Sequence, residues 1–327
     1  MSRKIDCHVH LVGDGSSGSG CWFRLDSLYQ RLQARFMLKG MKINAKYLKG
    51  GLDEVYVETL ASMVRESSLD AMVVLAQDIP YDRKGNPIPD KAAYYVPNEY
   101  LFEVVEKYSD VLIPAASIHP GRPDAMEELQ RCIDKGARVL KLLPNCLDID
   151  YSEDRYRPFW ECMAENRMIL LSHTGGEQTL PVINADLADP ALLKTPLECG
   201  VTCIAAHAAG RSVLFDPDYT EHLIRMFQHH PNLYADNSAL SSLNRARTIP
   251  KILNEDILPR ILHGSDLPVP ITGSGSWMQR VIKWRDYRRC QQIDNSLERD
   301  YQLKLAMGFP EASFHKLDSI LAGEDRN

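Results

Sequence analysis

Short apolar runs rich in β-branched residues alternate along the chain with longer amphipathic stretches. The clearest helix-like stretches are 53–67, 98–109, 123–135, 155–166 and 218–229. The apolar runs mostly lack polar alternation and have the length of buried parallel strands. They occupy residues 5–9, 71–76, 111–116, 139–142, 168–172, 201–206, 233–235 and 261–263. This order predicts parallel βαβ units, and eight repeats favour an α/β fold closed as a (β/α)8 TIM barrel. An open doubly wound sheet is the alternative.

Two connections are too long to be simple turns. Segments 11–51 and 77–97 each follow a predicted strand, so in a barrel they lie over the C-terminal face, where active sites form. We expect a lid and a pocket wall. The Gly/Ser-rich stretch at 13–20 lacks a following Gly-Lys-Ser/Thr, so it is not expected to bind phosphate. Helical segments at 277–292, 297–306 and 310–321 end the chain, and no linker divides the single predicted domain, 1–327.

Composition narrows the class of protein. The 327 residues are 44% hydrophobic and 25% charged, which is typical of a globular protein. The formal net charge of -6 does not suit a nucleic-acid binder. No apolar run approaches the roughly 20 residues of a membrane span, and no signal peptide is evident, so we expect a cytoplasmic enzyme. The eight cysteines are irregularly spaced without a CxxC, and we expect them to be reduced.

The first strand carries a histidine pair. In Asp6-Cys7-His8-Val9-His10, alternate side chains share a face, so His8 and His10 point the same way and Val9 faces the helices. Two imidazoles at this spacing can hold one cation. Asp6 lies one step deeper on the predicted face, where it either supports a ligand imidazole or makes only a structural contact.

Polar side chains recur at the ends of later strands. Lys141 belongs to the fourth run, His173 and His207 follow the fifth and sixth, and Asp266 follows the eighth. The spacings of 32 and 34 residues each match about one βα unit, and the spacing of 59 matches about two. We therefore expect these groups to converge at one end of the barrel.

These residues in this order resemble the amidohydrolase superfamily, and more closely its amidohydrolase 2 branch of metal-dependent hydrolases and decarboxylases. The resemblance rests on Ile-Asp-Cys-His-Val-His, Gly-Ala-Arg-Val-Leu-Lys-Leu-Leu-Pro-Asn, Leu-Ser-His-Thr, Ala-Ala-His and His-Gly-Ser-Asp-Leu-Pro-Val-Pro. It covers residues 4 to about 321. One departure is that many relatives have Lys-x-His-Pro on the fourth strand, where this chain has Lys141-Leu-Leu-Pro144.

The resemblance implies a site residue by residue. A divalent metal would be held by His8, His10, His173 and Asp266. Asp266 would also move the proton of a bound water. His207 would contact water or substrate in a one-metal site, or bind a second ion. Lys141 would be catalytic, either carbamylated and bridging two ions or as a charged partner for substrate or for a pocket carboxylate.

Three imidazoles and one carboxylate leave an open position on the ion, and nitrogen-rich ligands favour zinc. The main expectation is hydrolysis of a C–N or C–O bond in a small molecule, such as an amide, cyclic amide, lactone or ester. The alternatives are non-oxidative decarboxylation of an unsaturated or aromatic acid, and a catalytically silent barrel. Arg211 and His119 are the expected substrate-binding residues. The oligomeric state stays open, and a homo-oligomer is one possibility.

Overall fold

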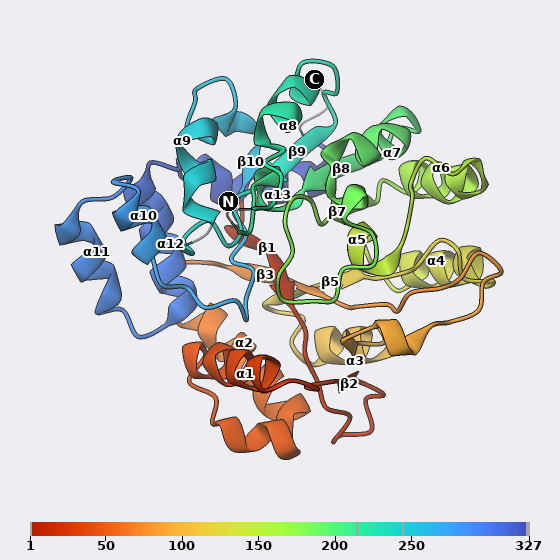
Figure 1. Cartoon of the computed structure of the whole chain (residues 1–327), viewed down its shortest axis with the longest axis horizontal. Coiled ribbons are helices and arrows are strands. Elements are labelled where there is room, and N and C mark those ends of the chain that lie inside the picture. The colour runs from red at the N-terminus through yellow and green to blue at the C-terminus, as the bar shows by residue number, and fades with distance from the viewer. Residues whose placement is uncertain (1, 214, 244, 325–327) are drawn as a thin grey trace.

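The structure is a computed structural model that describes residues 2–213, 215–243 and 245–324 (Figure 1). Eight parallel strands follow one another in chain order and pair as neighbours. They are β1 (Ile5–His10), β3 (Ala71–Leu75), β5 (Leu112–Ala116), β6 (Val139–Leu142), β7 (Ile169–Ser172), β8 (Thr202–Ala205), β9 (Leu233–Asp236) and β10 (Ile261–Leu262). Backbone hydrogen bonds from His10 N to Leu267 O (2.8 Å) and from Cys7 N to His263 O (2.9 Å) join the first strand to the last. The predicted barrel is confirmed, and the open sheet is excluded.

Helices surround the strands, as Figure 1 shows. The predicted helix at 277–292 is in fact two helices, because Arg280 has a left-handed backbone (φ 59°) just after the first ends. The helices are α1 (Leu28–Gly40), α2 (Leu52–Arg65), α3 (Asn98–Lys107), α4 (Ala125–Asp134), α5 (Pro144–Leu147), α6 (Arg157–Glu165), α7 (Lys194–Glu198), α8 (Thr220–Phe227), α9 (Ile249–Ile252), α10 (Ser274–Met278), α11 (Trp284–Gln291), α12 (Ser296–Met307) and α13 (Ala312–Ala322).

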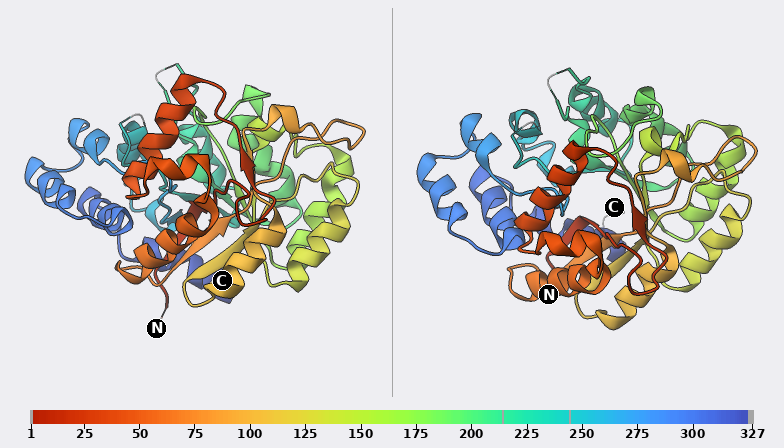
Figure 2. Two further views of the ribbon diagram at one scale, coloured as in Figure 1. Left: turned by 90° about the horizontal axis from the view of Figure 1, so that it is seen from below. Right: turned by 60° about the horizontal axis from the view of Figure 1, so that its bottom comes forward.

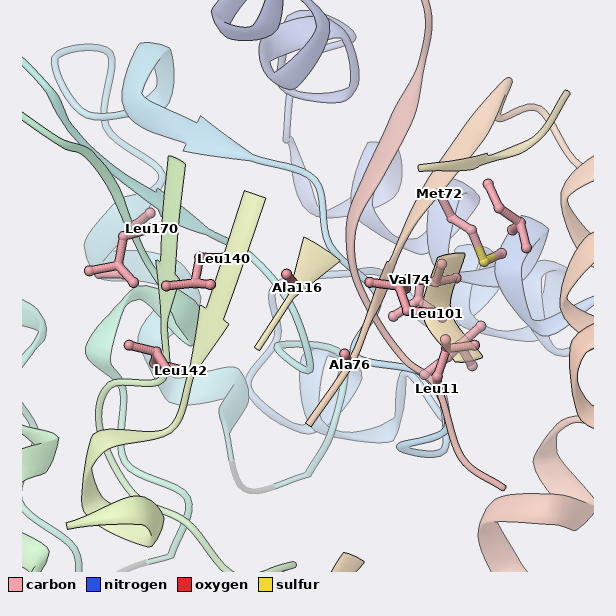
Figure 3. Close-up of a cluster of buried hydrophobic side chains, with 14 of the residues drawn as sticks. Leu11, Met72, Val74, Ala76, Leu101, Ala116, Leu140, Leu142 and Leu170 are labelled. Carbon is pink, nitrogen blue, oxygen red and sulfur yellow. The ribbon is translucent and has the colours of Figure 1, made fainter. Parts of the chain in front are cut away.

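The core has two layers because successive strand residues face opposite sides. One cluster fills the barrel interior, and Leu317 of α13 joins it. The other cluster lies between strands and helices, and Figure 3 shows part of it, including Met72, Val74 and Leu140. Val9 belongs to this outer cluster, as predicted. The strands are therefore apolar at most positions, and Asp6 and Lys141 are buried polar exceptions inside them.

The two long connections are joined to each other. β2 (Trp22–Phe23) in the first pairs antiparallel with β4 (Tyr94–Tyr95) in the second. Figure 2 shows the red helix α1 of the first connection near the blue C-terminal helices. An ion pair of 3.1 Å between Lys42 and Asp294 links these regions. Segment 11–51, called the lid below, is thus tied to the barrel through β2 and through this contact.

The Gly/Ser-rich stretch of the lid wraps a carboxylate of the protein itself. Asp53 of α2 accepts hydrogen bonds from the backbone nitrogens of Asp14, Gly15 and Ser17 and from the hydroxyls of Ser17 and Ser19, at 2.6 to 3.1 Å. Burial alone would raise the pKa of Asp53, but these donors outweigh it and lower the pKa to about 2. The stretch therefore anchors the lid to α2.

Two expectations from composition can be compared with the coordinates. All eight cysteines are free thiols, and six of them are buried. Across the described residues, no helix combines the length and apolar character that a membrane crossing requires.

Candidate metal centre

Three side chains meet at the carboxyl ends of the first and last strands. His8 and His10 project from β1, and Asp266 lies in the turn after β10. The Nε2 atoms of His8 and His10 are 3.3 Å apart, and each lies 3.3 Å from Oδ1 of Asp266. Two imidazole nitrogens that present lone pairs to each other repel, so a shared cation would stabilise this triangle.

Hydrogen bonds behind the imidazoles fix which nitrogen faces the triangle. Nδ1 of His8 lies 2.8 Å from Oδ2 of the buried Asp236, so it donates and leaves Nε2 as a lone pair. Nδ1 of His10 lies 3.0 Å from the hydroxyl of Tyr94, and that hydroxyl donates to Oε1 of Gln77 over 3.3 Å. The oxygen of Tyr94 then accepts from His10. Both Nε2 atoms are therefore free to bind an ion.

His207 follows β8 on a left-handed backbone. His207, Ala208 and Ala209 have φ of 59°, 47° and 55°, a conformation that costs free energy in residues other than glycine and persists where the surroundings enforce it. Asp236 enforces it here, since its Oδ1 accepts from the backbone nitrogen of His207 at 2.7 Å. Nδ1 of His207 donates to the carbonyl of Ser238 over 3.2 Å, so Nε2 carries the lone pair.

His173 follows β7 and lies at the edge of this group. Its Nε2 is buried and has no hydrogen-bond partner among the described residues. Oε2 of Glu177 lies 3.6 Å from this nitrogen, and the ring centroid of His173 is 5.1 Å from that of His207. A buried nitrogen without a partner is unfavourable unless it serves a ligand. His173 therefore has an unpaired ring nitrogen next to His207, and its expected role as a ligand of the triangle stays a prediction.

Lys141 of β6 is fully buried, and its Nζ lies 3.1 Å from Nε2 of His8. Burial lowers the pKa of Lys141 to about 8, and burial together with the Lys141 charge lowers the pKa of His8 to about 4. An ion bound to His8 would compete with the ammonium for the same lone pair. Lys141 thus contacts a candidate metal ligand, whereas the sequence favoured a substrate or carboxylate partner.

The donor set fits one divalent ion. Imidazole nitrogens and a carboxylate are ligands that zinc and manganese accept. Burial alone would raise the pKa of Asp266, but the imidazoles of His8 and His10 hold it well below its ordinary value, so the carboxylate is ionised. Among described residues, His8, His207 and Asp236 form a second close cluster. Hydrogen bonds from His8 Nδ1 and His207 N to Asp236 account for this cluster without an ion.

A cavity of about 160 Å³ opens in front of the triangle. His10, His173, His207 and Asp266 line its inner end. The remaining wall is mainly apolar and comes largely from the lid and from segment 77–97. The lid side includes Val12, Phe23, Leu25, Ala34, Met37 and Leu38, and segment 77–97 adds Ala93 and Tyr94. Both long connections therefore contribute to the pocket wall, where the sequence placed them.

Comparison with known proteins agrees with this geometry. The sequence profile of the amidohydrolase 2 family, described as an amidohydrolase, matches residues 5–288. The chain belongs to the amidohydrolase family, in its amidohydrolase 2 branch. It is accordingly an amidohydrolase-type enzyme with a divalent-metal site. No curated protein matches it in sequence.

Solved structures share the fold of this amidohydrolase at low identity. An uncharacterized TIM-barrel protein from Bordetella bronchiseptica is 18% identical with a TM-score of 0.56, and the match covers 91% of this chain and 98% of that one. A 5-carboxyvanillate decarboxylase from Sphingomonas paucimobilis is 12% identical (TM-score 0.51, 95% and 100% covered). A dihydroxybenzoic acid decarboxylase from Polaromonas, with bound manganese and the inhibitor 2-nitroresorcinol, is 14% identical (TM-score 0.50, 93% and 98% covered).

The two residues expected to bind substrate lie elsewhere in the amidohydrolase. His119 is buried, with its Nδ1 accepting from the nitrogen of Gly121 (2.9 Å) and its Nε2 donating to the carbonyl of Leu147 (3.1 Å), so both ring nitrogens support a loop. Arg211 pairs with Asp218 at 3.5 Å. Neither is among the described residues that line the cavity. Their expected contacts with substrate therefore stay predictions.

Asp6 was expected either to support a ligand imidazole or to make only a structural contact, and the structure shows a structural contact. The pairing register shifts between Asp6 and Val9, which breaks strict alternation in β1. Oδ1 of Asp6 accepts from the backbone nitrogens of His8 (3.0 Å) and Ser265 (2.9 Å), not from an imidazole. Burial raises the pKa of Asp6 to about 7.

Sequence reasoning missed the residues that support the amidohydrolase site. Asp236 ends β9, so its strand-end position was the available signal, but the predicted strand stopped one residue earlier. Tyr94 and Glu177 lie in long loops, where no periodicity marks them. Arg245 donates to the carbonyls of Gly176 (2.7 Å) and Gly210 (3.2 Å) and so ties the loops after β7 and β8 together.

Proposed function

We propose that this amidohydrolase is a metal-dependent, non-oxidative decarboxylase of a small aromatic or unsaturated carboxylic acid. The cavity is the observation that carries the proposal. Its volume of about 160 Å³ is close to the roughly 150 Å³ known to hold benzene, so it suits one ring. Mainly apolar walls with a few polar groups are typical of a site that orients a small ligand by its polar substituents.

The charge around the cavity supports an anionic substrate. The lid residues 21–51 contain seven Lys or Arg and one Asp, a net charge of +6 in a chain whose total is -6. Residues 277–292, near the lid, contain five Lys or Arg and one Asp. A positive rim at a cleft raises the association rate of anions. A carboxylate profits from this field, and a neutral lactone or amide does not.

Two of the structural neighbours are decarboxylases of hydroxylated aromatic acids by name, and one holds manganese. In this proposal His8, His10, His173 and Asp266 hold the ion. A bound divalent ion supplies a Lewis acid that polarises substrate oxygen and stabilises negative charge. The nitrogen-rich ligands favour zinc, and the manganese neighbour makes Mn²⁺ the second ion to test.

Decarboxylation breaks the bond between the carboxylate and the substrate carbon. The electron pair stays on that carbon, CO2 leaves, and the carbon takes up one proton. Solvent water supplies that proton, because the Asp266 carboxylate is ionised and Nε2 of His207 carries a lone pair. Both residues line the cavity, so we assign them the relay and orientation of the proton. The apolar wall helps release because CO2 is neutral and the carboxylate is charged.

Hydrolysis of a C–N or C–O bond is the second candidate. It is favoured by the position of Asp266, which lies beside the candidate ion and the open cavity, where it could deprotonate a water.

One experiment separates the two candidates. Protein loaded with Zn²⁺ or Mn²⁺ is offered hydroxybenzoates, 5-carboxyvanillate, lactones and cyclic amides, and both CO2 and new carboxylate are measured. CO2 release with loss of the substrate carboxylate supports decarboxylation. New carboxylate from a lactone or amide without CO2 overturns it in favour of hydrolysis. No turnover of any substrate, with metal bound, supports the silent barrel.

A further inference from the structure

Each backbone nitrogen of the turn 264–266, which contains Asp266, donates a hydrogen bond. The nitrogen of Gly264 donates to Oδ1 of Asn237 (3.2 Å), that of Ser265 to Oδ1 of Asp6 (2.9 Å), and that of Asp266 to the carbonyl of His8 (2.8 Å). A side chain on Gly264 would place its Cβ 2.9 Å from the Cβ of His8. The backbone of the turn thus packs directly on a candidate ligand, and a shift of Gly264 would displace both His8 and Asp266.

One contact to this turn comes from outside the barrel. Nζ of Lys304, on α12, donates to the carbonyl of Gly264, two residues before Asp266. The same ammonium pairs with Oδ2 of Asp300 at 2.5 Å, one helical turn earlier on α12, and lies 3.5 Å from Nδ1 of His263. Lys304 is 0% exposed and Asp300 is 1% exposed. The ammonium is therefore directed at the turn and away from solvent.

Stability alone does not explain this pair. Two buried charges lose their hydration, and apolar residues of similar size often give an equally stable or more stable protein. The pair instead fixes the position of the Lys304 ammonium, because residues four apart on a helix are neighbours and Asp300 binds it. The pair also lies beyond residue 288, where the match of this chain to the family profile ends.

We propose that Lys304 is a positioning residue for the candidate metal centre. Held by Asp300, it fixes the carbonyl of Gly264 and so sets the distance between Asp266 and the two histidines of β1. Residues that orient metal ligands from behind typically change metal affinity or activity by roughly 10- to 100-fold when replaced. The inference rests on the candidate metal centre and does not depend on the reaction.

The test compares two neutral pairs of nearly equal shape. Asp300→Asn/Lys304→Gln keeps a donor at position 304, and Asp300→Asn/Lys304→Met removes it. Lys251→Met, which loses an ion pair with Asp218 (3.2 Å) away from the turn, is the control. Zn²⁺ and Mn²⁺ dissociation constants are measured by competition with a chromophoric chelator, alongside the melting temperature of each metal-free variant.

We expect the Met variant to bind metal roughly 10- to 100-fold more weakly than the Gln variant at a similar melting temperature. The Gln variant and the control should stay near the wild type. Equal metal affinities in the two double variants would overturn the proposal, as would a loss that only follows the melting temperature. If the Met variant does not fold, Asp300→Leu/Lys304→Met replaces it in the same comparison. A wild type that binds neither ion would remove the metal centre itself, which is a different result.

Discussion

The strand ends and the lid differ in how far their side chains are buried. At the strand ends, His8 and Lys141 are fully buried, and supporting hydrogen bonds fix the orientation of the imidazoles. On the lid helix α1, Leu28, Tyr29 and Phe36 are more than half exposed. The barrel therefore holds the reactive groups in one arrangement, whereas the lid forms much of the cavity wall and exposes apolar side chains on α1. Chemistry should depend on the first region and substrate selection on the second.

The largest effect should come from Asp266→Asn at the strand ends. The amide keeps the size of the side chain but loses its charge and its capacity to accept a proton. We expect kcat to fall by roughly 10²- to 10⁴-fold, the range for loss of a general acid or base. Turnover and bound metal are measured together. Asp90→Asn, at an exposed position, is the control, and an unchanged kcat in Asp266→Asn would remove the carboxylate from the mechanism.

Asp236→Asn tests the support behind the ligands. Asp236 accepts from Nδ1 of His8 and from the backbone of His207, and an amide can replace only part of this. We expect metal affinity and activity to fall by roughly 10- to 100-fold. Competition with a chelator measures the affinity. A variant with wild-type affinity would show that the ring orientation of His8 does not depend on this carboxylate.

Asp53→Ala tests the lid instead. Its loss removes the hydrogen bonds that fold residues 14–19, so the lid should detach while the strand ends stay intact. We expect KM to rise on the order of tenfold with kcat nearly unchanged, since binding contacts are lost and reacting groups are not. Limited proteolysis should cut within the lid. Asp26→Ala, an exposed lid position, is the control. A fall in kcat or metal affinity would contradict the separation of the two regions.

The smallest effect should be that of salt. If the lid attracts an anionic substrate, kcat/KM should fall severalfold between about 20 and 300 mM salt, because screening shortens the reach of surface charges. Replacing the exposed Arg31 and Arg35 with Gln should flatten this dependence, and replacing Lys107 and Lys135, exposed elsewhere, should not. A dependence that is the same in all three proteins would mean that the lid charge does not guide the substrate.

The sequence predicted the regular part of this molecule well. All eight strands were expected within a residue or two, because apolar runs and βα spacing report directly on a barrel. The convergence of His8, His10, His173, His207 and Asp266 followed from the same spacing. Asp236 and Tyr94 did not, since their roles depend on contacts between segments far apart in the chain. The substrate-binding role expected of His119 stays a prediction, since its ring nitrogens support a loop and it does not line the cavity.

The C-terminal helices change what counts as the functional unit of this chain. The match to the family profile ends at residue 288, after every candidate ligand and all eight strands. Yet Leu317 of α13 completes the packing inside the barrel, and Lys304 of α12 reaches the turn of Asp266. A fragment chosen by its motifs would contain all the chemistry and lack the parts that close the barrel interior and align the site. A working site therefore requires the C-terminal helices as well, although they contain none of the candidate ligands.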